Sequence, residues 1–470
     1  MNWKTIFKSL KNRDMQKRLL IVLGVIVVYR FLTVIPIPLA EPTQMKEVVN
    51  SVLGGSDFGS FLSLLSGGAL ASFSIILVGL TPFITASIIS QLLTKAIPRL
   101  NELHKDGEAG RRKINQWTRF ATIPLAIIQS IGFIFILRQT VLSGNTTILA
   151  DPTAVEWIVA VTAMTAGAVF LMWLGELATE QGVGQGISLL ILAGILSQLP
   201  QILGHLVGGI FDTSAGGLNV FGWFTIPVDP TTFWVALSLA VVSILLLYVL
   251  VKINEAQRIV TVNYAKRVQG NADYTGVKSV LPIKLIAAGV IPVIFAVSFL
   301  TLPALIGQAL QASGNEAYAT LAANLIAWFQ APTPGTFTGS VLESFIYPGA
   351  YFVLVILFTY FYTGIVFNAH DIAEDLQNRG GFIEGVRPGM STEKYLTTTV
   401  NRLVLFGSIV LGLIAITPFV AEYLLYQLAG VSVQNLSIGG TGLLIVVSVG
   451  LESLRQINSR ALMVTYDDYK

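Results

Sequence analysis

The feature that most constrains this chain is an uncharged stretch from Phe58 to Thr94, which contains no Asp, Glu, Lys or Arg. One membrane crossing needs about 20 apolar residues, so the stretch is too long for a single span. The run Ser66-Gly67-Gly68 interrupts it too early for two spans. The pattern predicts a short helix, Phe58–Leu65, then a turn, then a full span from about Ser72 to Thr94. Because lipid cannot satisfy open backbone groups, the short helix must lie inside protein or in a watery cavity.

The composition identifies the class of protein. Charged residues make up 12% of the chain, about half the usual share in soluble proteins, and the mean hydropathy is +0.72. We therefore predict an all-α polytopic membrane protein. The chain has no Cys, which excludes disulfides, thiolate nucleophiles and Cys-ligated metals.

Segments of spanning length with few or no charges recur along the chain, and we predict ten spans. Because ten is even, both termini are expected on the same side of the membrane. The predicted spans are Leu19–Ile35, Ser72–Thr94, Trp117–Val141, Val155–Leu174, Gly184–Leu206, Thr231–Val251, Ile283–Ile306, Phe345–Phe367, Leu403–Val420 and Ile438–Leu454.

The distribution of basic residues predicts the orientation. All but three of the 29 Lys and Arg residues lie on one side of the predicted membrane, the exceptions being Arg30, Lys46 and Arg138. The long loops Pro200–Pro230 and Thr301–Ser344 contain neither Lys nor Arg. Because basic loops stay in the cytoplasm, both termini are predicted to be cytoplasmic.

Two short patterns recur five spans apart. Gly79–Ile84 in the second span and Gly289–Ile294 in the seventh both read G-x-x-P-x-I. Ser188–Ile191 in the fifth span resembles Gly442–Ile445 in the tenth. Five is odd, so the two halves would cross the membrane in opposite directions, as in inverted repeats. We predict an N-terminal half at 1–206, an external hinge loop at 207–230 and a C-terminal half at 231–470.

The sequence argues against an enzyme and against an ion-coupled carrier. The phosphate-loop, zinc-protease and nucleophile-elbow motifs are absent, and His104, His205 and His370 lie in loops or at span ends. Carriers normally place charged groups inside their spans, and here the main one is Arg30, which we expect to snorkel to the outer interface. Large aliphatics beside Gly and Pro would suit a pore gated by dewetting, although ordinary helix packing is the favoured interpretation of that pattern alone.

A family resemblance adds to this interpretation. Ser66-Gly-Gly-Ala-Leu and Thr81-Pro-Phe-Ile-Thr-Ala-Ser resemble the plug and second span of the SecY family, the central channel subunits of the bacterial Sec protein translocase. Further blocks follow in the family's order and extend over nearly the whole chain. They begin at Glu108 (EAGRRKI), Met172 (MWLGE), Gly182 (GVGQGIS), Val262 (VNYAKR), Ala288 (AGVIP), Phe361 (FYTGIVFN), Gly385 (GVRPG) and Gly439 (GGTGLLI).

The resemblance implies an hourglass pore between two inverted five-helix halves. Its waist would be closed by a ring of aliphatic side chains, carried over by motif as Leu80, Ile84, Ile187, Ile191, Ile294 and Ile445. A plug at about 57–72 would block the outer funnel at rest, with the residues Phe58, Phe61, Leu62, Leu65, Ser66, Gly67 and Gly68. The second and seventh spans would form a lateral gate through which apolar substrate helices enter lipid.

The basic cytosolic loops at 252–284 and 368–402 have two interpretations. The positive-inside rule alone accounts for many such loops. The resemblance instead implies docking of the SecA ATPase or of the ribosome, whose RNA phosphates attract basic residues. The residues implied are Arg258, Lys266, Arg267 and Arg387, with Arg387 held at a loop tip by Pro388 and Gly389.

The expected function is a protein-conducting channel of the cytoplasmic (inner) membrane that has no catalytic residues and no cofactor. It would translocate unfolded preproteins with signal peptides and release transmembrane segments into membrane lipid. SecE and SecG are the expected membrane partners, and SecA or a ribosome would supply the driving force. The competing hypotheses are an ion-coupled secondary transporter with an inverted repeat and an intramembrane enzyme.

Overall fold

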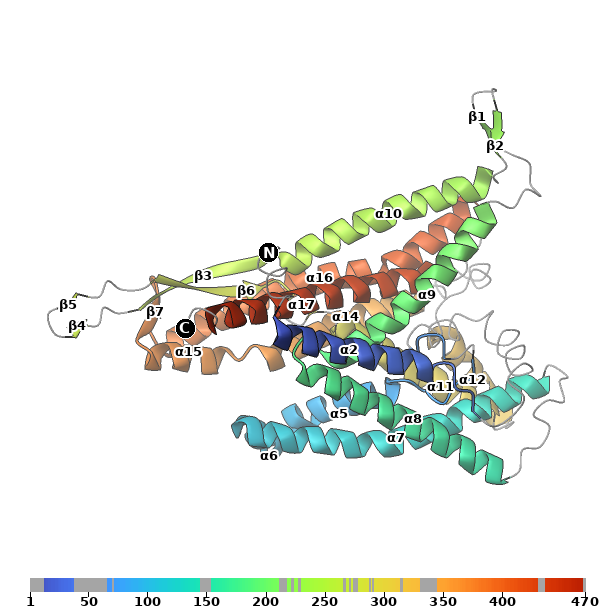
Figure 1. Ribbon diagram of the computed structural model, residues 1–470, viewed down its shortest axis with the longest axis horizontal. Coiled ribbons are helices and arrows are strands. Elements are labelled where there is room, and N and C mark those ends of the chain that lie inside the picture. Colours follow the sequence, from blue (N-terminus) through green and yellow to red (C-terminus); the bar gives the residue numbers. More distant parts are fainter. Residues whose placement is uncertain are drawn as a thin grey trace. The chain divides into compact units, whose positions relative to one another are not determined.

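A computed structural model describes most of the 470 residues, and helices dominate the described part, so the all-α prediction is confirmed (Figure 1). The chain forms two compact units. The first comprises Met1–Val241, Val297–Pro348 and Pro418–Lys470, and the second comprises Val242–Ala296 and Gly349–Thr417. The described residues are 12–37, 66–69, 72–143, 154–210, 218–220, 224–226, 230–264, 268–269, 272–273, 278–286, 289, 291–312, 316–329, 345–429 and 436–467.

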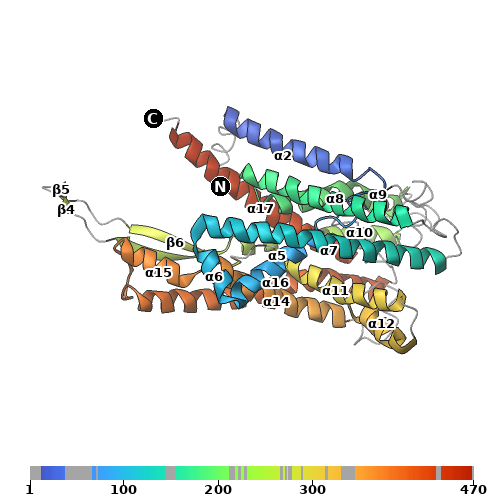
Figure 2. The same cartoon turned by 90° about the horizontal axis from the view of Figure 1, so that it is seen from below.

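The N-terminal part of the first unit is a series of packed helices. They are α2 (Arg13–Leu32), α5 (Thr81–Ala96), α6 (Pro98–Lys105), α7 (Gly107–Ser143), α8 (Ala154–Glu180) and α9 (Gly186–Ile210). Local sequence explains several starts: Asn12 caps α2 by accepting a hydrogen bond from the Asp14 amide, and α5 and α6 each begin with a proline in the first turn. In Figure 2, α5, α6 and α7 lie together, and α7, α8 and α9 pack in sequence.

The segment before α5 differs from the prediction. Residues 72–80 form turns, and α5 begins at Thr81, nine residues after the predicted start of the span at Ser72. Backbone bonds fasten this segment to the chain after α2: the Ile37 amide donates to Phe73 O (2.9 Å), and the Ile75 amide donates to Ile35 O (3.0 Å). These external partners replace the bonds of an extra helical turn. At 16 residues, α5 is about 24 Å long.

The second unit contains a small sheet within the segments that are predicted to be basic loops. Its order is β6-β3-β7, all antiparallel, with β3 at Gln257–Tyr264, β6 at Lys278–Lys284 and β7 at Gly381–Ile383. The short strands β4 (Val268–Gln269) and β5 (Ala272–Asp273) pair with each other. The loops at 252–284 and 368–402 are therefore largely folded in the described residues.

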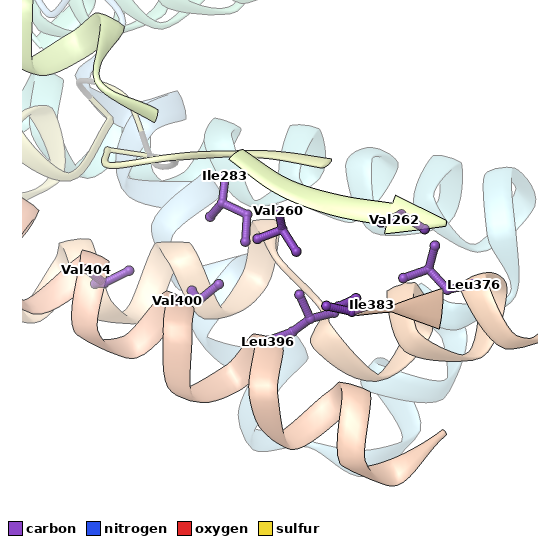
Figure 3. Close-up of a cluster of buried hydrophobic side chains, with 8 residues drawn as sticks. All are labelled: Val260, Val262, Ile283, Leu376, Ile383, Leu396, Val400 and Val404. Atoms are coloured by element: carbon purple, nitrogen blue, oxygen red, sulfur yellow. The ribbon is translucent and has the colours of Figure 1, made fainter. Parts of the chain in front are cut away.

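A buried apolar cluster holds this sheet on two helices, α15 (Ala369–Asn378) and α16 (Met390–Ala429) (Figure 3). Alternation on β3 directs Val260 and Val262 inward. Spacings of four residues on α16 direct its apolar residues toward the sheet. The cluster consists of Val260, Val262, Ile283, Leu376, Ile383, Leu396, Val400 and Val404.

The remaining elements complete the chain. They are β1 (Leu218–Val220), β2 (Phe224–Ile226), α10 (Pro230–Glu255), α11 (Ile291–Ala312), α12 (Glu316–Phe329), α14 (Ile346–Val366) and α17 (Leu436–Asp467). The hairpin β1–β2 lies in the predicted hinge loop, and α12 lies in the predicted loop Thr301–Ser344.

Within the described ranges, five helical segments are long and apolar enough to cross a membrane. The predicted count of ten spans and the division into inverted halves remain predictions. The five segments are Gly107–Ile134, Ala154–Glu180, Ala236–Glu255, Ile346–Asn378 and Met390–Leu424.

Candidate functional site

A tight turn, Ser66–Ala69, lies between the predicted plug helix and α5. Ser66 and Ala69 are almost fully buried. Gly67 and Gly68 adopt φ values of 67° and 88°, in the left-handed region that a residue with a Cβ rarely enters. The shape of the turn therefore depends on the two glycines. The other predicted plug residues, Phe58, Phe61, Leu62 and Leu65, lie outside the described residues.

Arg30, in the last turn of α2, holds this turn in place. Its Nη1 donates to Gly67 O (2.7 Å) and to the Ser197 hydroxyl on α9 (2.8 Å). Arg30 is exposed, as a snorkelling side chain would be, but its guanidinium also binds a backbone carbonyl, a role that the prediction did not include. Sequence reasoning missed this role because the acceptor lies 37 positions away and is a main-chain atom, which leaves no residue pattern.

The candidate ring residues Leu80 and Ile84 lie at the start of α5. Leu80 is the N-cap residue, and its carbonyl accepts the Ile84 amide at 3.0 Å. Both side chains are buried, at 5% and 6% exposure. Four residues apart, they share one face of the helix, so the late start of α5 places them at its N-terminal end.

The candidate ring residues of α9 and α17 lie on neighbouring helices. Ile191 and Ile445 are buried, at 1% and 4% exposure, and α9 packs against α17. Ile187 is half-buried, and its Cγ1 lies so close to Gly175 on α8 that a Cβ there would come within 2.9 Å. Because Gly175 has no side chain, the start of α9 packs closely against α8.

Ile294 differs from the other ring candidates because it belongs to the second compact unit. It is buried in the first turns of α11, and the adjacent Phe295 makes edge-to-face contacts with Phe358 and Tyr362 of α14. Five of the six candidate ring side chains are therefore buried and Ile187 is half-buried, while closure of the six into one ring remains a prediction.

The candidate docking residues Arg258 and Arg387 are both exposed. Arg387 lies in the loop between β7 and α16, flanked by Gly385 and Gly389 in the left-handed region (φ 78° and 91°). The hydroxyl of Thr392 donates to Arg387 O at 2.9 Å, which ties the loop to the first turn of α16. Lys266 and Arg267 lie outside the described residues.

An ion pair joins the two helices beneath this loop. His370 Nδ1 on α15 lies 2.9 Å from a carboxylate oxygen of Glu393 on α16. This hydrogen bond, with the nearby negative charge of Glu393, raises the pKa of His370 above its usual value. The pair connects α15 and α16 where the Arg387 loop emerges.

Two arginines converge on the turn between α8 and α9, and sequence reasoning missed both. Arg18 Nη1 donates to Gln181 O at 3.3 Å. Gly182 has φ 65°, and the Arg460 guanidinium lies so close to it that a Cβ there would require the guanidinium to move. The glycine-rich sequence GVGQGIS, starting at Gly182, was a visible signal of a tight turn, but it gave no sign of these partners.

Comparison with known proteins supports the resemblance. The family model described as SecY matches residues 74–454. The Protein translocase subunit SecY of Streptomyces galbus is 37% identical over 468 residues, covering 98% of each chain.

Two solved structures show the same fold. One concerns the plug domain of the SecY protein, which stabilises the closed state of the translocation channel and maintains a membrane seal (TM-score 0.59, 19% identity, 92% of this chain and 89% of that chain). The other is Sec61 in the canine ribosome–channel complex from the endoplasmic reticulum (TM-score 0.54, 18% identity, 94% and 91%). With full-length similarity in sequence and fold, the chain belongs to the SecY family, the channel subunits of protein translocases.

Proposed function

We propose that this chain forms the path by which unfolded polypeptides cross a membrane and by which apolar segments leave sideways into lipid. The observation that carries the proposal is the end-to-end similarity to protein translocase subunits, at 37% identity over 98% of both chains. The comparisons give no support to the ion-coupled transporter or to the intramembrane enzyme.

The buried aliphatic side chains supply the physical basis of the gate. Leu80, Ile84, Ile191, Ile294 and Ile445 are each at most 7% exposed. An apolar constriction excludes water and therefore ions, because water gains too few hydrogen bonds there. A polypeptide can displace such side chains without breaking any hydrogen bond between them. The ring thus acts as a seal that yields to a chain and closes behind it.

Lateral release follows from the cost of burying charge. At the bilayer centre, each Leu or Ile of a substrate helix favours insertion by about 0.3–0.6 kcal/mol, whereas each Asp, Lys or Arg costs about 2.5–3.5 kcal/mol. A sufficiently apolar segment therefore partitions into lipid, and a polar one continues through the pore. We place the gate between the second and seventh spans, which contain α5 and α11.

The cytosolic sheet and the Arg387 loop form the proposed docking surface for the motor. Arg258 and Arg387 are exposed and the cluster beneath them is buried and packed, which suits binding to the SecA ATPase or to ribosomal RNA phosphates. Lys266 and Arg267 extend the same charge along the chain. SecE and SecG are the proposed membrane partners, and the protein is proposed to span the cytoplasmic membrane with both termini in the cytoplasm.

A vesicle assay tests the proposed function. Inverted vesicles in which this chain is the sole channel subunit would receive SecA, ATP and a radiolabelled preprotein. We expect ATP-dependent protection of the preprotein from added protease, and no protection after Arg387→Glu in the docking loop. Vesicles that contain correctly assembled chain but never protect a preprotein would overturn the proposal.

A further inference from the structure

Three segments meet at the Arg30 side chain. The guanidinium Nη1 bridges Gly67 O of the turn Ser66–Ala69 and the Ser197 hydroxyl of α9, at 2.7 and 2.8 Å. Ser197 in turn donates to Gly194 O at 2.6 Å, which fixes the hydroxyl on its own helix. The end of α2, the turn and α9 are therefore joined by one connected set of hydrogen bonds, which we call the Arg30 clamp.

Close packing reinforces the Arg30 clamp. A Cβ on Gly194 would lie 3.1 Å from Gly67 Cα and 2.8 Å from the hydroxyl oxygen of Tyr29. Tyr29 is itself only 2% exposed. The turn thus lies directly on α9 with glycine against glycine, and a side chain on either glycine would force the turn, α9 or the Tyr29 hydroxyl to shift.

The Arg30 clamp favours the state in which the turn Ser66–Ala69 packs against α9. Hydrogen bonds from a charged donor are about twice as strong as neutral ones, and the guanidinium loses its carbonyl acceptor if the turn moves away. A contact made in only one of two states shifts the equilibrium toward that state. Gly194 lies three residues after the ring candidate Ile191 on α9, so the clamp and that candidate share a helix face.

We propose that Arg30 is a positioning residue that holds the C-terminal end of the plug against α9 and thereby sets how readily the channel opens, an inference that rests on the proposed channel function. When the turn leaves α9, as plug displacement requires, the bond to Gly67 must break. A signal segment that opens the channel must supply that free energy through its own binding. Removing the clamp therefore lowers the binding strength that a signal segment needs.

Two variants remove the clamp by different means, and one control leaves it intact. Arg30→Gln removes the charged donor, and Gly194→Ala inserts a methyl group between the turn and α9. The control, Arg119→Gln, breaks the 2.6 Å ion pair between α7 and Glu176 of α8 in the same unit. It tests whether the loss of any arginine contact has the same effect.

The first measurement is the resting conductance of each purified translocase in planar bilayers without substrate. We expect an open probability about tenfold above the unaltered channel for Arg30→Gln and Gly194→Ala, as the loss of one charge-assisted hydrogen bond implies, and no rise for Arg119→Gln. The second measurement is translocation of a preprotein whose signal segment has been made less apolar, which should improve only in the two clamp variants.

The outcomes separate the clamp from the channel function. If ordinary preproteins cross through both variants while resting conductance and signal requirement stay unchanged, the clamp is overturned and the channel stands. A lower unfolding temperature with unchanged conductance would assign Arg30 a structural role and also overturn the clamp. If Arg30→Gln fails to assemble, Gly194→Ala decides. If preproteins fail to cross even through the unaltered chain, the proposed function itself is wrong.

Discussion

The buried cluster beneath the proposed docking surface offers the most quantitative prediction. Leu396 on α16 is fully buried, at 0% exposure, and packs among residues from β3, β6, β7 and α15. Leu396→Ala would leave a cavity. The side chains around this cavity are held in place by the sheet and by the helices. Such substitutions cost about 2–5 kcal/mol. At about 3 kcal/mol, the opened population of this part of the second unit rises roughly a hundredfold.

Hydrogen exchange measures that change directly. β3 pairs with β6 in a continuous register from Gln257 to Asn263. Every second β3 amide along this register donates to β6, and these amides exchange only when the sheet opens. We expect Leu396→Ala to accelerate their exchange about a hundredfold, in proportion to the opened population. The matched control is Val280→Ala on β6, which is 59% exposed and should change stability by less than about 0.5 kcal/mol.

The same variant links packing to function. Arg258 and Arg387 are carried by β3 and by the β7–α16 loop, so an opened cluster would no longer hold them in one arrangement. We expect weaker SecA or ribosome binding, with little change in resting conductance. Unchanged exchange rates in Leu396→Ala would refute the reasoning, because they would show that the cluster does not determine the stability of this region.

Three further predictions follow from the turn, the ion pair and the loop. Gly182→Ala should lower the unfolding temperature in detergent, because φ 65° is strained for alanine and the Arg460 guanidinium occupies the space. The raised pKa of His370 in the folded chain means that its pair with Glu393 stabilises fully below about pH 6.5 and is lost as pH rises through the folded pKa; an NMR titration that finds an ordinary or lowered pKa would contradict this. Arg387→Glu should weaken ribosome or SecA binding by about tenfold or more and reduce its salt dependence, and binding unaffected at low salt would count against the docking surface.

Several elements could be predicted from residue patterns, and others depended on distant contacts. Long apolar runs identified α8, α10 and α14 because burial in lipid requires them. The same rule misread residues 72–80, where apolar side chains lie in turns bound to the chain after α2. Basic residues in 252–284 suggested a loop, although the alternation around Val260 and Val262 was the visible signature of a strand. Charge alone does not distinguish a loop from a surface sheet.

The candidate site likewise contains features that residue patterns predicted and features that they did not. Glycines 67, 68, 182, 385 and 389 all have positive φ. The residues predicted the turn at Gly67 and Gly68, and the resemblance implied the loop tip at Gly389. The arginines that contact these turns could not be predicted from the sequence, because Arg30 binds one main-chain carbonyl and Arg18 binds another. Every carbonyl in a sequence looks alike, so only folding identifies which one an arginine reaches.

The central claim is that polypeptide passes through the aliphatic ring, and the absence of native Cys makes it directly testable. Single cysteines would replace Ile84 on α5 and Ile191 on α9, with matched controls at Ile89 and Leu196, which lie on the same helices and are 43% and 45% exposed. A preprotein with one Cys would be arrested halfway through. If polypeptide passes through the ring, disulfides form at the two ring positions and none form at the controls. Crosslinks absent from Ile84 and Ile191 with equal arrest, or equally frequent at all four positions, would contradict it.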